Sequence, residues 1–209
     1  MRRARRVYYD IFSRFYDGFV ALHSRDRQGL ARKFLVERVP VEQDGSVLDL
    51  CTGTGTLLPY LQAKVGDGGQ VVGVDFSPGM LKMAQRKTLR LTNVRLVQAD
   101  VGSLPFAPET FDAVTCSHAF YELKGETQKQ ALQEIVRVLR PGGAFLMMEH
   151  DVPSNRFVKI LFYFRLTFIG AGRAIALLRH EQEVLEGYFG SVEKVLSPAG
   201  RSKIMICRK

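Results

Sequence analysis

The chain has no tryptophan and only three cysteines among its 209 residues. Cys51, Cys116 and Cys207 lie far apart, and their spacing is neither that of a metal site nor that of a disulfide framework. We therefore predict that they are small apolar strand residues, that the chain has no metal centre, and that it works in a reducing, cytoplasmic compartment. Long apolar runs are lacking as well. In the apolar region 156–179 the longest uncharged stretch is 166–172, which excludes a membrane-spanning helix of ~20 residues there.

Positive charge is in excess. The chain has 30 Lys and Arg against 21 Asp and Glu, for a net charge of +9. Such an excess attracts anions, which include nucleic acids, acidic membrane surfaces and acidic small molecules. The basic residues are dispersed and no nucleic-acid recognition module is present, so we predict no nucleic-acid partner. We expect a small-molecule partner, and leave peripheral membrane contact and the oligomeric state open.

Hydrophobic residues make up 46% of the chain and charged residues 24%, which is typical of one globular domain of this length. β-Rich runs alternate with helical patterns, and this alternation predicts an α/β fold with a parallel sheet. The expected strands are 46–50, 70–74, 94–99, 111–116, 144–149, 192–196 and 203–207, the last two forming a hairpin. The expected helices are 56–64, 78–91 and 126–139, the last ending at the breaker Arg140-Pro141-Gly142-Gly143.

Apolar residues also flank the predicted sheet. We expect a single domain in which a helical cap (1–45) precedes a cofactor-binding core (46–150), and a helical insert with the strand hairpin (151–209) follows. With the cations near them, the flanks can form an apolar lid with a positive rim, suited to a lipophilic molecule or an anionic membrane surface. Equally, they can pack on the core with their arginines solvated. One helix face in the first flank is predicted by residues that recur every three or four positions, namely Tyr8, Phe12, Phe15, Phe19 and Leu22.

A glycine turn joins the first predicted strand to the first predicted helix. Gly53 and Gly55 let the backbone bend tightly and approach a ligand where a Cβ would be in the way. Asp75 ends the second strand, where a carboxylate can accept both ribose hydroxyls of a nucleotide. The combination predicts a nucleotide-type cofactor.

Charge distinguishes a dinucleotide from S-adenosylmethionine. A dinucleotide site needs a third glycine, where this chain has Leu58, and a turn open to pyrophosphate. Asp49, just before the turn, would repel pyrophosphate but attract the ammonium and sulfonium groups of S-adenosylmethionine. We therefore predict S-adenosylmethionine as the cofactor and S-adenosylhomocysteine as the product. The alternative for Asp49 is a carboxylate that caps the loop.

The third predicted strand ends at another carboxylate, Asp100, on the same edge of the sheet. Asp100 can accept the adenine amino hydrogen, and the backbone N–H of Val101 can reach a ring nitrogen. Asp100 can instead cap the turn at 102–104. Phe76 and Met80 can supply apolar walls of the same site or belong to the core.

Several stretches of the segment 47–149 resemble, in order and spacing, the motifs of the class I S-adenosylmethionine-dependent methyltransferases. They are VLDLCTGTG, VVGVDFSPGMLKMAQRK, VQADVGSLPFAPETFDAVTCSHAF and VLRPGGAFLMMEHD. In particular, the chain resembles the ubiquinone and menaquinone biosynthesis C-methyltransferases (methyltransferase domain type 11) and their small-molecule relatives. The resemblance implies a Rossmann-like sheet of seven mostly parallel strands with a helical cap.

The resemblance also implies site residues. Cofactor contacts would come from Thr54 in the glycine turn, from Asp75 to the ribose, from Asp100 and Val101 to adenine, and from Ser117 after the fourth strand. The N-terminal FSRFYDGF resembles an element of the family whose tyrosine closes over the methionine end of the cofactor. That residue is Tyr16 here, and it can instead extend the helix stripe.

The chain departs from the quinone group after the fourth and fifth strands. It has His118-Ala119-Phe120-Tyr121 where that group has a glycine–leucine–arginine–asparagine run, then Glu149-His150-Asp151, and a shorter C-terminal segment. His118, Tyr121 and His150 are therefore the candidates to face the transferring methyl group as catalytic residues. Histidine with its ordinary pKa of ~6.5 suits deprotonation of a phenol, thiol or carbon acid. Loop hydrogen bonds alone would also place histidines there.

These patterns together predict an enzyme that transfers a methyl group from S-adenosylmethionine to a small, lipophilic acceptor. Quinone precursors, phospholipid amines and thiols all fit, although the departures argue against a quinone. The alternative is a non-catalytic cofactor-binding module that acts through a partner or a membrane. An oxidoreductase is a more distant alternative.

Overall fold

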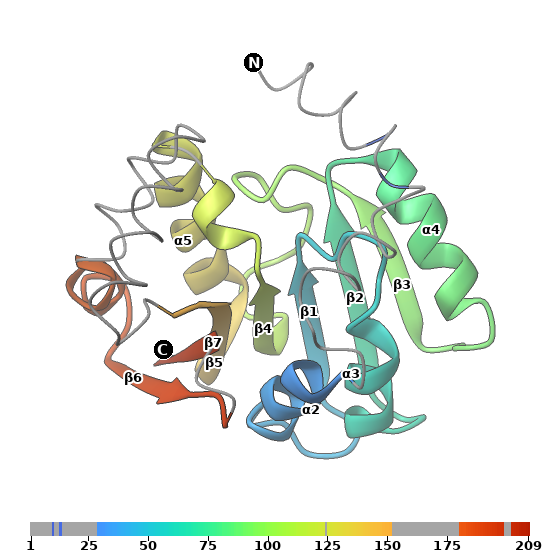
Figure 1. The fold of residues 1–209 in the computed structure, drawn as a ribbon, viewed down its shortest axis with the longest axis horizontal. Coiled ribbons are helices and arrows are strands. Elements are labelled where there is room, and N and C mark those ends of the chain that lie inside the picture. The colour runs from blue at the N-terminus through green and yellow to red at the C-terminus, as the bar shows by residue number, and fades with distance from the viewer. Residues whose placement is uncertain (1–9, 11–12, 14–28, 124, 152–179, 199–201) are drawn as a thin grey trace.

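The computed structural model describes residues 10, 13, 29–123, 125–151, 180–198 and 202–209. Its strands are β1 Ser46–Leu50, β2 Gln70–Asp75, β3 Val94–Gln98, β4 Phe111–Ser117, β5 Leu139–His150, β6 Ser191–Leu196 and β7 Ser202–Arg208. They form a seven-stranded sheet in the order β3-β2-β1-β4-β5-β7-β6 (Figure 1). Strands β1 to β5 are parallel, and β7 is antiparallel to both of its neighbours. The predicted α/β fold with a mostly parallel sheet is confirmed.

Helices cover both faces of the sheet (Figure 1). One hydrophobic cluster packs α5 against the sheet through buried residues such as Leu132 and Ile135. A second cluster packs α2 and α3 on the other face, through residues such as Leu35 and Leu61. Strands β1 and β2 bury all but their first residue because both of their faces are covered. The helices are α2 Leu30–Glu37, α3 Leu58–Val65, α4 Pro78–Thr88, the 3-10 turn η1 Phe120–Glu122 and α5 Glu126–Val138, and residues 180–186 are helical too.

Six of the seven strands lie within one residue of their predicted bounds. The exception is β5, which begins at Leu139 rather than at 144. The predicted breaker forms an irregularity inside the strand, where Gly142 has φ +76° and the β4–β5 register shifts between Phe111 and Ala113. The predicted β6–β7 pairing is confirmed.

The helix predictions differ more. Helix 78–91 ends earlier, at Thr88, and helix 56–64 begins later, at Leu58. Helix α2 lies within the expected helical cap (1–45), although its bounds were not predicted, and its Leu35 is buried in the core. Cys51 is not a strand residue: it follows β1 with φ +53° and begins the glycine turn.

Several predicted features lie outside the described residues. These are the N-terminal aromatic stripe, Tyr16 and the region 156–179. Among the residues that the structure describes, no helix is long and apolar enough to cross a membrane.

Candidate cofactor and acceptor site

The glycine turn lies at the carboxyl edge of the sheet, directly after β1. Gly53 and Gly55 both have positive φ, +56° and +71°. A Cβ on Gly55 would lie 2.7 Å from the Cβ of Ala84, so Gly55 allows α4 to pack against the turn. A Cβ on Gly53 would meet its nearest atom, the Cys51 carbonyl oxygen, only at 3.9 Å. The turn is therefore closed toward α4 and open at Gly53.

Asp75, at the end of β2, holds this turn. Its Oδ2 accepts a hydrogen bond from the backbone N–H of Gly53 at 2.9 Å, and its Oδ1 accepts one from the N–H of Ser77 at 2.9 Å. The carboxyl group is 5% exposed, and burial raises its pKa. Asp75 thus lies beside the turn, as the spacing predicted.

The N-terminus of α4 follows Asp75 and is capped twice. The Ser77 Oγ accepts from the N–H of Met80 at 3.1 Å, as an N-cap serine does. Asp10, from the N-terminal part of the chain, accepts from the Ser77 hydroxyl at 2.6 Å and from the Gly79 N–H at 3.0 Å. Asp10 therefore ties the N-terminal segment to the predicted ribose side of the site, a contact that the sequence did not reveal.

Asp49 makes the contacts of a loop-holding carboxylate. Its Oδ2 accepts from the Thr52 hydroxyl at 2.7 Å and its Oδ1 from the Thr115 hydroxyl at 2.8 Å. Burial raises its pKa to about 6, and the two hydroxyls oppose that rise. Asp49 joins the glycine turn to β4, in line with the loop-capping alternative.

Lys87 was not predicted as a site residue. Its Nζ donates to the hydroxyl oxygens of Thr54 at 2.9 Å and of Thr56 at 2.7 Å. It follows Ala84 by three residues and so lies on the face of α4 that contacts the turn. That spacing on the helix is the signal by which Lys87 could have been found from the sequence. A cation thereby supports the turn from α4.

Asp100 lies at the carboxyl edge after β3, as predicted. Its Oδ1 accepts from the Gly102 N–H at 3.0 Å, and its carbonyl accepts from the Ser103 N–H at 2.9 Å. The carboxylate therefore caps the short turn while it lies at the edge. Val101, the other predicted adenine contact, is buried in the core cluster next to α5.

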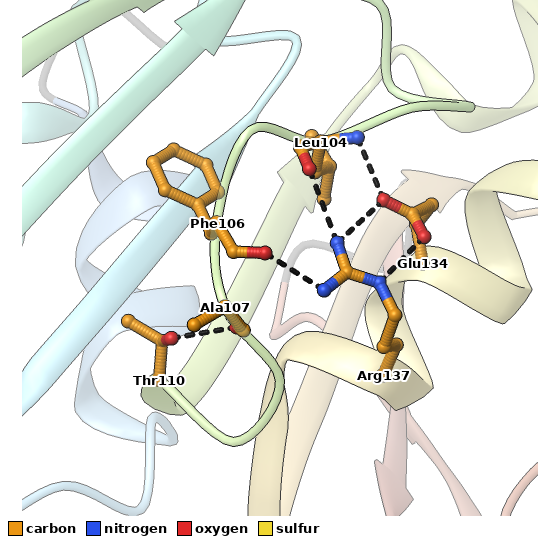
Figure 2. A network of polar contacts seen from close by, with 6 residues as sticks. All are labelled: Leu104, Phe106, Ala107, Thr110, Glu134 and Arg137. Atoms are coloured by element: carbon orange, nitrogen blue, oxygen red, sulfur yellow. Dashed lines mark hydrogen bonds and ion pairs between the residues drawn. The ribbon is translucent and has the colours of Figure 1, made fainter.

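The loop that follows Asp100 is fixed to α5 by an ion pair on that helix, whose two side chains form hydrogen bonds with the loop backbone (Figure 2). Arg137 donates to both carboxylate oxygens of Glu134 at 2.7 Å, and to the carbonyl oxygens of Phe106 at 2.7 Å and Leu104 at 3.1 Å. Glu134 also accepts from the Leu104 N–H at 2.7 Å. The arginine hydrogen bonds lower the pKa of Glu134, which stays ionised. This pair holds the loop after β3 in place.

The remaining predicted cofactor residues lie in the same region. Phe76 is half-buried and Met80 is buried, on the two sides of the α4 N-cap. Ser117 ends β4 and is half-buried. Contacts of these side chains with a cofactor stay predictions.

His118 and His150 follow β4 and end β5, and the structure brings their rings together. The ring centroids are 4.4 Å apart with an interplanar angle of 33°. His118 has φ +53°, its N–H donates to the Met148 carbonyl at 2.7 Å, and its buried Nδ1 has no hydrogen-bond partner among the described residues. Burial, then the charges of His150 and Arg32, lower its pKa to about 3. His118 is therefore neutral near pH 7 and a weaker base than its ordinary pKa led us to expect.

Tyr121, the third predicted catalytic residue, is engaged in a buried polar cluster. Its hydroxyl donates to Glu181, which also accepts from the ammonium of Lys203. Its backbone N–H donates to Glu149 at 3.3 Å. Sequence reasoning did not identify Glu149, Glu181 or Lys203 as site residues, because they meet through the β5–β7 register and a helix distant in sequence.

S-adenosylmethionine fits these residues. The glycine turn is open at Gly53, where a side chain would otherwise stand. Carboxylates lie at the carboxyl ends of β2 and β3, at Asp75 and Asp100, and carboxylates suit ribose hydroxyls and an adenine amino group. The glycine turn, which follows the neighbouring strand β1, carries the hydroxyls of Thr54 and Thr56, to which Lys87 donates. Together these protein groups suit a polar nucleoside that carries positive charge.

Comparisons with known proteins show what the chain is similar to. Residues 47–143 match the family described as methyltransferase domain. The chain is 32% identical over 176 residues to a demethylmenaquinone methyltransferase of Staphylococcus epidermidis, covering 83% of this chain and 72% of that protein. It is 33% identical over 183 residues to the demethylmenaquinone methyltransferase of Staphylococcus aureus, covering 87% and 75%.

Solved structures share the fold. A S-adenosylmethionine-dependent methyltransferase from Aquifex aeolicus superposes with a TM-score of 0.63 at 20% identity, covering 88% of this chain and 92% of that one. The PH0226 protein of Pyrococcus horikoshii superposes with a TM-score of 0.65 at 23% identity, covering 88% and 90%. At these identities the likeness concerns the fold.

Proposed function

Because the chain belongs to the class I S-adenosylmethionine-dependent methyltransferases, within the group that contains the demethylmenaquinone methyltransferases, we propose that its acceptor is a reduced, lipophilic quinone ring that is methylated at carbon. S-adenosylmethionine is its cofactor. The observation that carries the proposal is the paired rings of His118 and His150 at the ends of β4 and β5, in a chain one-third identical to these relatives. The two departures from the quinone group in this region therefore concern the details of the acceptor rather than its class.

When bound, the cofactor supplies a methyl carbon on a sulfonium, which is already an activated leaving group. The chain's task is to align a carbon nucleophile with that methyl carbon and to exclude water. On the cofactor side, Asp75 fixes the glycine turn from β2, and Asp49 at the end of β1 joins the turn to Thr115 of β4. The Arg137–Glu134 pair fixes the loop after β3. These rigid contacts orient the transferable group before the acceptor arrives.

On the acceptor side, a hydroquinone carbon becomes more nucleophilic when its ring hydroxyl donates a hydrogen bond or loses a proton, because electron density then shifts into the ring. With the cofactor bound, its sulfonium would supply the methyl carbon to this ring carbon and keep the electron pair of the broken carbon–sulfur bond. The ring carbon would lose its proton to water after the methyl transfer. The Nδ1 of His118 is buried beside β4, and in its neutral form it accepts a hydrogen bond from the ring hydroxyl of the hydroquinone. His118 orients and polarises that hydroxyl rather than holding a full proton, because its pKa is low.

The test compares three acceptors with methyl-labelled S-adenosylmethionine: a demethylated naphthohydroquinone kept reduced in detergent micelles, a phosphatidylethanolamine and an aromatic thiol. We expect label on a ring carbon of the hydroquinone and at least tenfold less on the others. The His118→Gln variant should lower kcat for the hydroquinone by about tenfold to a hundredfold, which is less than the loss of a full acid–base group, because His118 polarises the hydroxyl without taking its proton. Preferential labelling of the amine or the thiol would overturn the proposal.

A further inference from the structure

A buried polar cluster lies below the carboxyl edge of the sheet, next to His118 and His150. It consists of Tyr121, Glu149, Glu181 and Lys203. Lys203 is 1% exposed and Glu149 4% exposed. The Lys203 ammonium donates to one oxygen of Glu181, and the Tyr121 hydroxyl donates to the other. The ammonium also lies 5.5 Å from the centroid of the Tyr121 ring.

Such a cluster is not explained by stability alone. Burying charges has a large desolvation cost, and apolar side chains of similar volume often stabilise a fold as well as or better than a buried ion pair. The surroundings here include the apolar core, because Tyr121 packs against the hydrophobic cluster that contains Leu185 and Phe189. Because the polar cluster lies at the carboxyl ends of β4 and β5, where the methyl acceptor is proposed to bind, it is a candidate for a role in the site.

Glu149 connects this cluster to the turn after β4. It is paired with Lys203 across the β5–β7 register. Its carboxyl oxygen accepts from the backbone N–H of Tyr121 at 3.3 Å, and the N–H of Phe120 bonds to the same carboxyl group. These two N–H groups belong to η1, which begins two residues after His118. Burial raises the pKa of Glu149 to about 8, so the group is largely protonated at pH 7 and still accepts both bonds.

We propose that Glu149 is a positioning residue for the acceptor side of the site, because it fixes the backbone turn that carries His118. The Tyr121–Glu181–Lys203 chain ties the far end of the same turn to β7 and to the helical residues 180–186. The inference rests on the proposed function in one respect, that the acceptor binds at the ends of β4 and β5. Loss of the Glu149 carboxyl group should disturb the part of the site that binds the hydroquinone. It should leave the glycine turn intact, since that turn is held by Asp75.

The test uses the full chain and three variants. Glu149→Leu removes the acceptor of both N–H bonds, and Glu149→Gln keeps a neutral oxygen in the same place. Glu193→Gln, which removes an exposed carboxylate on β6, is the control. The first readout is hydrogen exchange of a peptide spanning 118–123, compared with one spanning 51–58. The second is the split between kcat and KM for the hydroquinone, with the dissociation constant of S-adenosylhomocysteine.

We expect Glu149→Leu to speed exchange at 118–123 at least tenfold and to lower kcat/KM for the acceptor at least tenfold, with cofactor affinity and exchange at 51–58 within threefold of wild type. Glu149→Gln should recover at least half of the loss on a logarithmic scale, and Glu193→Gln should match wild type. Wild-type exchange at 118–123 in Glu149→Leu would overturn the proposal, as would equal losses at both peptides.

Two provisions keep the test decisive. If Glu149→Leu does not fold, Tyr121→Phe removes only the hydroxyl that reaches Glu181, and it should speed exchange at 118–123 about threefold or more. No change there would overturn the tie to β7. If wild type methylates no hydroquinone, the proposed function fails, whereas the exchange comparison still decides whether Glu149 fixes the turn.

Discussion

The carboxylate of Asp75 accepts a hydrogen bond from the backbone N–H of Gly53 at 2.9 Å, so the end of β2 holds the turn that follows β1. Sequence spacing predicted both residues for one cofactor site, and the hydrogen bond joins them directly. The glycine turn and Asp75, the predicted ribose ligand, therefore form one unit, and a substitution of either residue should change the position of the other.

We expect Asp75→Ala to weaken binding of S-adenosylhomocysteine more than tenfold. The variant removes the predicted ribose acceptor together with the hydrogen bonds to Gly53 and Ser77, and hydrogen bonds to charged groups contribute about 1.5–3 kcal/mol each. Titration calorimetry measures the effect. Asp67→Ala is the control, because Asp67 is exposed and accepts a hydrogen bond from the Gln62 amide at 3.2 Å. Equal affinity of wild type and Asp75→Ala would contradict the assignment.

The two glycines of the turn should respond differently to alanine. Both have positive φ, which costs an alanine about 1–2 kcal/mol. Gly55→Ala also places a Cβ 2.7 Å from that of Ala84, whereas Gly53→Ala meets no atom closer than 3.9 Å. Urea unfolding should therefore show a larger loss for Gly55→Ala, by about 1–3 kcal/mol of overpacking. Adding Ala84→Gly should recover part of that loss, and no recovery would contradict the packing argument.

Breaking the Arg137–Glu134 pair should loosen the loop after β3. Arg137 holds two carbonyl oxygens of this loop as well as Glu134 (Figure 2). We expect Arg137→Met to weaken S-adenosylhomocysteine binding by about threefold to tenfold and to speed hydrogen exchange at 100–106. Arg140→Met offers a control, since Arg140 pairs with Asp112 at the opposite end of the sheet. An equal effect of both variants would show that the loss is not specific to the loop.

The pH dependence of stability should carry the signature of Glu149. Folding raises its pKa from 4.5 to about 8, so the native state holds a proton that the unfolded state has released between these values. Its contribution to stability is complete below pH 4.5 and is lost as the pH rises toward 8. The Glu149→Gln variant should therefore become more stable relative to wild type across this window. Urea unfolding at pH 5.5, 7 and 8.5 measures the difference, and a difference that does not change with pH would contradict the raised pKa.

Local patterns predicted the fold, and they predicted that the candidate cofactor residues would lie at one edge of the sheet. The apolar runs at 46–50 and 70–75, the glycines and Asp75 are separated by short stretches, and parallel strands bring their carboxyl ends to one edge whatever the details of packing. Asp49 was less predictable. One of its partners, Thr52, is three residues away, but the other is Thr115 in β4, and this contact depends on the β1–β4 register.

The acceptor side could be predicted only in part. The positions of His118 and His150 followed from the strand ends, but the low pKa of His118 depends on burial and on two charges from other elements. Glu149 and Lys203 are apart in sequence by a stretch that includes the region 152–179, and they meet because β7 is antiparallel to β5. Periodicity places residues on faces, whereas such pairings depend on register and topology.

The acceptor class is tested most directly with a whole-cell extract and methyl-labelled S-adenosylmethionine. After chemical reduction of the extract, the label is partitioned between organic, aqueous and macromolecular fractions, and the labelled compound is identified by mass spectrometry. We predict label in the organic fraction, on a ring carbon of a quinone and stable to mild base. Label in the aqueous or macromolecular fraction, or on a phospholipid head group, would contradict a lipophilic quinone acceptor.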